Sequence, residues 1–172
     1  MRNHQLLGLL GVPIICLLLI PGALRAAETD GSVYQDMSSH YEAIRLALLG
    51  DSLEGVNEHA SAIFKQATEL TDGFSPAKAG VPESQAGDVE VALREIQSAA
   101  SSLAAAGDLV SAREDLFALT KPMARYRKSS GTSGTVVAYC SMAQKAWIQP
   151  EGEIGNPYIG QKMPKCGEIV GE

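Results

Sequence analysis

Residues 39–70 read SHYEAIRLALLGDSLEGVNEHASAIFKQATEL, a sequence that predicts two helices joined by a tight turn. Ser39 followed three positions later by Glu42 is a capping box, which favours a helix start, and Gly50 favours a helix end. On both sides of Gly50, apolar residues recur three and four positions apart, which is the spacing of a helix with one buried face. The second helix is expected to start at Asp51, so this stretch predicts an antiparallel helical hairpin.

A second hairpin is expected further along the chain, after a connection over residues 72–87 that is rich in glycine and proline. Asp88 can cap a third helix, and a fourth helix is expected to begin near Asp108. Pro122 interrupts the apolar pattern of the fourth helix, so we expect a kink or an early end there. Two such hairpins predict a mainly α protein in which residues 39–129 form an antiparallel four-helix bundle.

The segments on either side of this bundle differ from it in pattern. Residues 27–38 are polar and lack sustained periodicity, so we predict a flexible leader. Residues 135–172 contain short β-prone runs separated by glycine and proline, which is typical of short strands and turns. Three runs are expected to be strands: residues 136–140, 146–149 and 168–170. We therefore predict a small irregular β-containing appendage packed on the bundle, with Trp147 as its main anchor.

The N-terminus has the pattern of a secretory signal peptide over residues 1–26. A short basic start precedes an uncharged apolar run from Leu6 to Ile20, and small residues follow. This run is shorter than the roughly 20 residues that a membrane-spanning helix needs. Cleavage near Ala26 would leave a periplasmic protein that is not inserted in the membrane.

Composition and motifs exclude several function classes. The chain has 172 residues and a formal charge of -6, and an acidic surface repels phosphate backbones, which argues against a nucleic-acid partner. No nucleophile motif, phosphate-binding loop or zinc-protease motif occurs in the sequence, so no enzyme activity is predicted. His40 and His59 are expected to be exposed to solvent, and a metal-ligand role for either stays open.

Four sulfur-containing residues of the appendage are the candidate ligands for a metal ion. Cys140 precedes Met142 by two positions, so both side chains would share one face of a strand, and Met163 precedes Cys166 by three. Two thiolates and two thioethers are soft ligands that suit Cu(I), whereas zinc normally takes histidine or further cysteines. These four residues therefore predict a soft-metal site.

A disulfide is the competing interpretation of the two cysteines. In an oxidising compartment a Cys140–Cys166 bridge would stabilise the glycine-rich appendage by roughly 3 kcal/mol, and the methionines would then serve packing. Lys162 and Lys165 would instead favour thiolates. Both interpretations stay open, because a reversible bridge would also control metal capture.

The appendage carries four short motifs: VAYCSMA at 137–143, AWIQ at 146–149, EIGNPY at 153–158 and KMPKCGE at 162–168. Together they resemble a bacterial family of uncharacterised exported domains that occur alone or appended to periplasmic adaptor subunits of copper and silver efflux systems. This resemblance implies metal handling by the four sulfur positions, and an efflux adaptor or another metal-handling protein as the partner. Ser141 stands where the family usually has proline, and Tyr139 where some members have histidine, which removes a possible nitrogen ligand.

The sequence therefore predicts a periplasmic protein, linked to heavy-metal efflux, that binds or buffers Cu(I) through Cys140, Met142, Met163 and Cys166. The alternative is a protein-interaction module that binds no metal. In that module a Cys140–Cys166 disulfide would hold a recognition surface formed by Trp147, Tyr158 and neighbouring turn residues.

Overall fold

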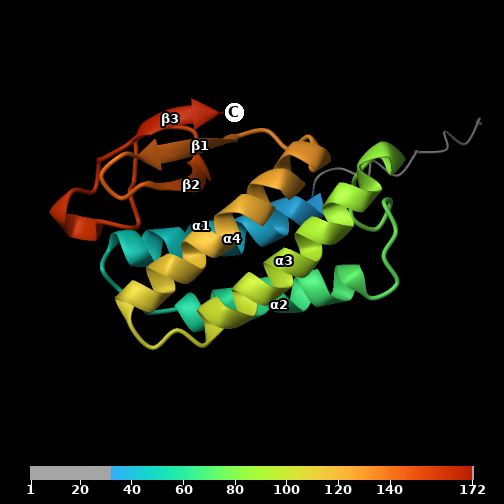
Figure 1. Ribbon diagram of the computed structural model, residues 1–172, viewed down its shortest axis with the longest axis horizontal. Coiled ribbons are helices and arrows are strands. Elements are labelled where there is room, and N and C mark those ends of the chain that lie inside the picture. Colours follow the sequence, from blue (N-terminus) through green and yellow to red (C-terminus); the bar gives the residue numbers. More distant parts are fainter. Residues whose placement is uncertain (1–31, 172) are drawn as a thin grey trace, which may run out of the picture.

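The computed structural model describes residues 32–171, which form four helices followed by a small sheet (Figure 1). The helices are α1 (Ser32–Leu49), α2 (Val56–Thr71), α3 (Ala86–Ala104) and α4 (Leu109–Ser130), with short 3-10 helices η1 (Glu83–Gln85) and η2 (Gly160–Lys162). The strands are β1 (Thr135–Cys140), β2 (Lys145–Pro150) and β3 (Glu168–Gly171). The predicted mainly α class with a β-containing C-terminal appendage is confirmed, while the predicted signal peptide lies outside the described residues.

Helices α1 to α4, the helical block, pack around one apolar core. Helix α1 contacts α2 and α4, and α3 also contacts both of these helices. The buried residues of α2 show why this helix forms, since they recur at the spacing of one helical face: Val56, Ala60, Ile63, Ala67 and Leu70. Burial of this face, rather than intrinsic helix propensity, supplies most of the stability of such helices.

The prediction of a flexible leader is wrong for residues 32–38, which form the first turns of α1. Tyr34 and Met37 are fully buried in the core of the helical block. The Ser39 hydroxyl does not cap a helix start, and it donates to the Asp36 carbonyl oxygen at 2.7 Å within the helix. The burial of two large side chains therefore outweighs the local capping signal.

Two other predicted helix starts are displaced by a few residues. Helix α2 begins at Val56 and not at Asp51, because the Asp51 carboxylate hydrogen-bonds to Arg113 instead of capping a helix. Helix α3 begins at Ala86, directly after η1, so Asp88 lies inside its first turn. The predicted connection over residues 72–87 is otherwise correct.

The start of α4 is confirmed, and of the two alternatives expected at Pro122, a kink or an early end, the early end does not occur. The Asp108 carboxylate accepts hydrogen bonds from the N–H groups of residues 110 and 111, at 2.8 and 2.9 Å, as an N-cap does. Helix α4 continues through Pro122, which is buried, to Ser130. Packing of this helix face therefore compensates for the hydrogen bond that proline cannot make.

The three predicted strands are confirmed and form an antiparallel sheet in the order β2-β1-β3. Strand β2 packs on α1 and α4, whereas β3 is the outer edge of the sheet (Figure 1). Ile148 of β2 belongs to the core of the helical block. Trp147 is also fully buried, but it packs in a separate small core with Ala138 and Cys140. Trp147 thus holds the appendage together, and Ile148 connects it to the helices.

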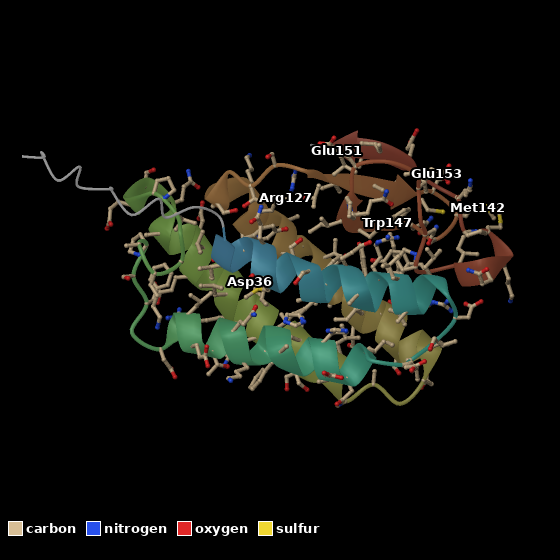
Figure 2. All side chains as sticks on the ribbon, turned by 180° about the vertical axis from the view of Figure 1, so that it is seen from behind. Asp36, Arg127, Met142, Trp147, Glu151 and Glu153 are labelled. Carbon is tan, nitrogen blue, oxygen red and sulfur yellow. The ribbon has the colours of Figure 1, made fainter. Side chains whose placement is uncertain are left out.

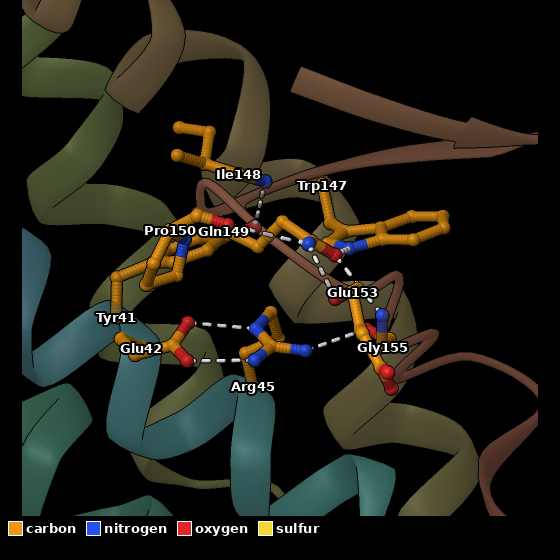
Figure 3. A network of polar contacts seen from close by, with 9 residues as sticks. All are labelled: Tyr41, Glu42, Arg45, Trp147, Ile148, Gln149, Pro150, Glu153 and Gly155. Atoms are coloured by element: carbon orange, nitrogen blue, oxygen red, sulfur yellow. Dashed lines mark hydrogen bonds and ion pairs between the residues drawn. The ribbon is translucent and has the colours of Figure 1, made fainter. Parts of the chain in front are cut away.

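Hydrogen bonds from the helices fix the loop that follows β2 (Figure 3). The Arg45 guanidinium binds the Glu42 carboxylate through two hydrogen bonds of 2.6 Å. Its Nη1 atom also donates to the Gly155 carbonyl oxygen at 2.6 Å. Arg113 of α4 makes a similar bond through Nε to the Pro157 carbonyl oxygen at 2.7 Å. These two arginines therefore set the position of the appendage on the helical block.

The same loop is also held from within the sheet by Gln149, which is only 2% exposed (Figure 3). Its Oε1 atom accepts hydrogen bonds from Nε1 of Trp147 at 2.8 Å and from the N–H group of Gly155 at 3.1 Å. Its Nε2 atom donates to the Glu153 carbonyl oxygen at 2.9 Å. All polar groups of this buried amide are used, which makes the loop a fixed support for the segment that follows it.

Candidate functional site

The pairing of β1 with β3 brings the two cysteines of the appendage together. Cys140 is the last residue of β1 and Cys166 lies two positions before β3, while Tyr139 and Glu168 face each other across the strands. Both cysteines are free thiols. Cys166 packs against the small core that contains Cys140, and each cysteine shifts the pKa of the other.

Cys140 is buried, and its surroundings stabilise a thiolate. Burial raises the pKa of Cys140, but hydrogen bonds from the Cys166 thiol and from the Ala143 and Met142 N–H groups outweigh it. The side chain of Asn156 adds a further hydrogen bond, and the net effect is a pKa below the ordinary value. The bond from the Ala143 N–H group to Sγ measures 3.5 Å.

Cys166 reaches solvent, and its pKa is raised above the ordinary value. Its hydrogen bond to Cys140 is the main reason why the pKa of Cys166 is raised, with burial and the charge of Cys140 adding to it. The side chain borders an open hollow of about 430 Å³ that Met163 also lines. On its other side Cys166 borders a hollow of about 230 Å³ next to Tyr139 and Ser141. The pair therefore consists of a buried cysteine whose pKa is lowered and an accessible cysteine whose pKa is raised.

Asn156 holds the segment that carries Cys166. It is fully buried, and its Nδ2 atom donates to the Cys166 carbonyl oxygen at 2.8 Å. Its Oδ1 atom accepts from the N–H groups of Tyr158 and Ile159, at 2.8 and 3.3 Å, in an Asx turn. The sequence analysis did not assign this role, although the Asn-Pro-Tyr motif is a recognisable turn signal.

Gly167 lets the chain pass over the indole ring of Trp147. Its φ of 148° is a backbone conformation that glycine adopts easily. A Cβ atom at this position would lie 2.6 Å from the Trp147 ring and 3.1 Å from the Tyr139 carbonyl oxygen. Glycine is therefore needed for Cys166 to approach Cys140 from this side.

The two methionines lie differently with respect to the thiol pair. Met163 is 41% exposed and shares its hollow with Cys166. Met142 is 65% exposed and borders a different hollow, next to Val110 of α4. Figure 2 shows Met142 at the end of the appendage far from Arg127. The expectation that Cys140 and Met142 share a strand face is wrong, because β1 ends at Cys140 and the chain turns there.

The structure does not support the prediction that Lys162 and Lys165 favour the thiolate form of the cysteines. Lys165 forms an exposed ion pair with Glu153 at 2.9 Å, between side chains that are 72% and 84% exposed. Neither Lys165 nor Lys162 is among the groups that lower the pKa of Cys140. Neutral N–H donors and the neighbouring thiol take this role, and the residue pattern alone did not indicate them.

His40 and His59 are half-buried and bind each other, contrary to the expectation of full exposure. Their Nδ1 atoms lie 3.0 Å apart, and they connect α1 to α2. Across residues 32–171, no three His, Cys, Asp or Glu side chains come close enough together to hold a metal ion. A metal site at the thiol pair would therefore need methionine, or an external molecule, as its third ligand.

Comparison with known proteins finds no matching protein family, no matching curated protein and no matching solved structure. The resemblance to exported domains of metal efflux systems thus stays a prediction from the motifs of the appendage. Between Ser32 and Gly171, no helix combines the length and the apolar composition that crossing a membrane requires.

Proposed function

We propose that this protein binds or buffers a soft metal ion, Cu(I), through the thiol pair Cys140 and Cys166. The observation that carries the proposal is the packing of two free cysteines against each other in one small core, where the buried one has a lowered pKa. Thiolate and thioether sulfur select Cu(I) over harder ions, and the accessible Cys166 gives an ion a route to the pair. Binding requires both sulfurs to be deprotonated, so Cu(I) uptake releases protons and weakens as pH falls.

Met163 is the proposed third ligand, because it lines the same hollow as Cys166. Met142 assists only if its side chain turns away from the hollow beside Val110. Its backbone N–H group lowers the pKa of both cysteines. The two methionines therefore contribute unequally, with Met163 the stronger ligand.

The remainder of the chain is proposed to act as a scaffold and to place the site outside the cytoplasm. Each helix contacts the next one along the chain, and α4 also contacts α1, which supports an antiparallel four-helix bundle. The N-terminal pattern supports export to the periplasm, with removal of residues 1–26. The motifs of the appendage support an efflux adaptor or another metal-handling protein as the partner.

The alternative is an interaction module without metal, and one observation favours it. Val110, Phe117 and Met142 are 72%, 40% and 65% exposed near the junction of α4 with the appendage. A partner would have to contact such residues, since Trp147 is fully buried and offers no recognition surface. This corrects the expected location of the surface.

Anaerobic titration of the reduced protein with Cu(I), against a competing chelator, tests the proposed function. We expect one Cu(I) per chain, a large loss of affinity in Cys140→Ser or Cys166→Ser, and a smaller loss in Met163→Leu. Met142→Leu is expected to lose less affinity than Met163→Leu. Met123→Leu is the matched control, because it removes a thioether that is buried within α4. No stoichiometric uptake by the reduced, folded protein would leave only the interaction module.

A further inference from the structure

The two sulfur atoms of the pair differ in access. Cys140 has no exposed surface, whereas Cys166 is partly exposed and borders hollows on two sides. The rate of thiol–disulfide exchange depends on which sulfur a reagent can reach. A small disulfide in solution therefore meets Cys166 and not Cys140.

The sulfur that a reagent cannot reach is nevertheless placed to react inside the protein. Cys166 packs against the small core that contains Cys140, and the pairing of Tyr139 with Glu168 places both cysteines at the same end of two neighbouring strands, so no large movement of the chain is needed to join them. We propose that Cys140 and Cys166 form a reversible disulfide, in which Cys166 exchanges with low-molecular-weight disulfides and buried Cys140 closes and reopens the bridge.

The Cys140–Cys166 bridge closes in two successive thiol–disulfide exchange steps. Cys166 first loses its proton to solvent and attacks one sulfur of the external disulfide, which breaks and releases one thiolate, leaving a mixed disulfide on Cys166. The Cys140 thiolate then attacks Sγ of Cys166 and releases the second external thiolate. The two protein thiols are oxidised by two electrons, and the external disulfide is reduced to two thiols.

Reopening follows the same route in reverse. A small thiolate attacks the accessible sulfur of Cys166, and Cys140 is the leaving group. The N–H group of Ala143 donates a hydrogen bond to Sγ of Cys140 at 3.5 Å and so stabilises the negative charge that this sulfur takes up. Attack at the exposed sulfur and departure of the stabilised one is the favoured direction for such a bond.

The bridge would have two consequences for the appendage. It would connect the segment before the edge strand β3 to the end of β1, and so fix the outer strand of the sheet. It would also remove both thiolates. This second consequence rests on the proposed function, because oxidation would then switch off Cu(I) binding.

Reaction with oxidised glutathione, followed by quenching with acid and mass spectrometry of peptides, tests which of the two cysteines reacts first with an external disulfide. Every version of the protein carries Cys16→Ser, so that only two cysteines remain. We expect glutathione on Cys166 in Cys140→Ser, and modification of Cys140 in Cys166→Ser at least about tenfold slower, because access limits exchange. The protein with both cysteines should show glutathione on Cys166 only transiently and end with a Cys140–Cys166 bridge.

The parent protein gives a readout that does not depend on the variants. Early time points locate the transient mixed disulfide even if a serine variant fails to fold, and Cys140→Ala offers a second variant. Modification of Cys140 as fast as Cys166 would overturn the proposal, and so would stable glutathione on Cys166 without closure of the bridge. Failure of Cu(I) binding would leave these results unchanged, so the two proposals fail separately.

Discussion

Replacing Arg45 with methionine tests how the helical block positions the thiol site. Arg45 is only 5% exposed, and it binds both oxygens of Glu42 and the carbonyl oxygen of Gly155. Methionine retains much of the side-chain volume but donates no hydrogen bond. Arg45→Met therefore leaves the Glu42 carboxylate and the Gly155 carbonyl group without their donor.

The expected loss of stability follows from these contacts. A hydrogen bond from a charged donor contributes about 1.5–3 kcal/mol, and removing one partner of a buried ion pair costs about 3–5 kcal/mol. The Glu42 side chain keeps 23% of its surface exposed, so water replaces part of what it loses. We therefore expect Arg45→Met to lower the free energy of unfolding by about 3 kcal/mol.

Urea unfolding measures this loss with two probes. Fluorescence of Trp147, the single tryptophan of the chain, reports on the appendage, and far-ultraviolet circular dichroism reports on the helices. Glu42→Gln is the matched control, since it removes the ion pair but leaves the bond from Arg45 to Gly155, and it should cost less. A loss below about 0.5 kcal/mol, typical of surface substitutions, would refute the role given to Arg45.

Three further substitutions test the site and its supports. Gly167→Ala would place a Cβ atom 2.6 Å from the Trp147 ring, at a residue whose φ is 148°. We therefore expect thermal melting to show at least about 2 kcal/mol of destabilisation. An unchanged melting temperature would contradict this. Asn156→Ala removes a hydrogen bond to Cys140, so the pKa of Cys140 should rise, as followed by thiolate absorbance during a pH titration; an unchanged or lower pKa would argue against this assignment. A hydrogen bond from a guanidinium lowers the pKa of Asp51, so its stabilisation is present above the ordinary value of 3.8 and is lost as pH falls through the lowered pKa. Asp51→Asn should therefore flatten the acid side of the stability profile in denaturant titrations, and an unaltered profile would count against the ion pair.

Much of the fold could be predicted because its signals are local. Apolar periodicity located the helices, Asp108 marked a helix start, and β-prone runs between glycines and prolines located all three strands. The first turns of α1 were missed because Ser39 carries a strong capping signal. The burial of Tyr34 and Met37, which extends the helix, depends on contacts with distant residues such as Tyr126.

The candidate site was less predictable, because its geometry depends on contacts between distant segments. Cysteine and methionine can be recognised by type, but the contact between Cys140 and Cys166 results from the pairing of β1 with β3. The donors that stabilise Cys140 are backbone N–H groups and a buried amide, and no side-chain pattern marks them. Met142 was assigned to the face of Cys140 by continuing the strand spacing past the predicted end of the strand at Cys140, where the chain turns.

X-ray absorption spectroscopy of the Cu(I)-loaded protein tests whether the thiol pair binds the metal, because it identifies the atoms bound to copper. We predict sulfur as the only type of neighbour, with fewer sulfur atoms in Cys166→Ser. Nitrogen or oxygen ligands in the loaded protein, or a spectrum that Cys166→Ser leaves unchanged, would contradict a metal site at the thiol pair.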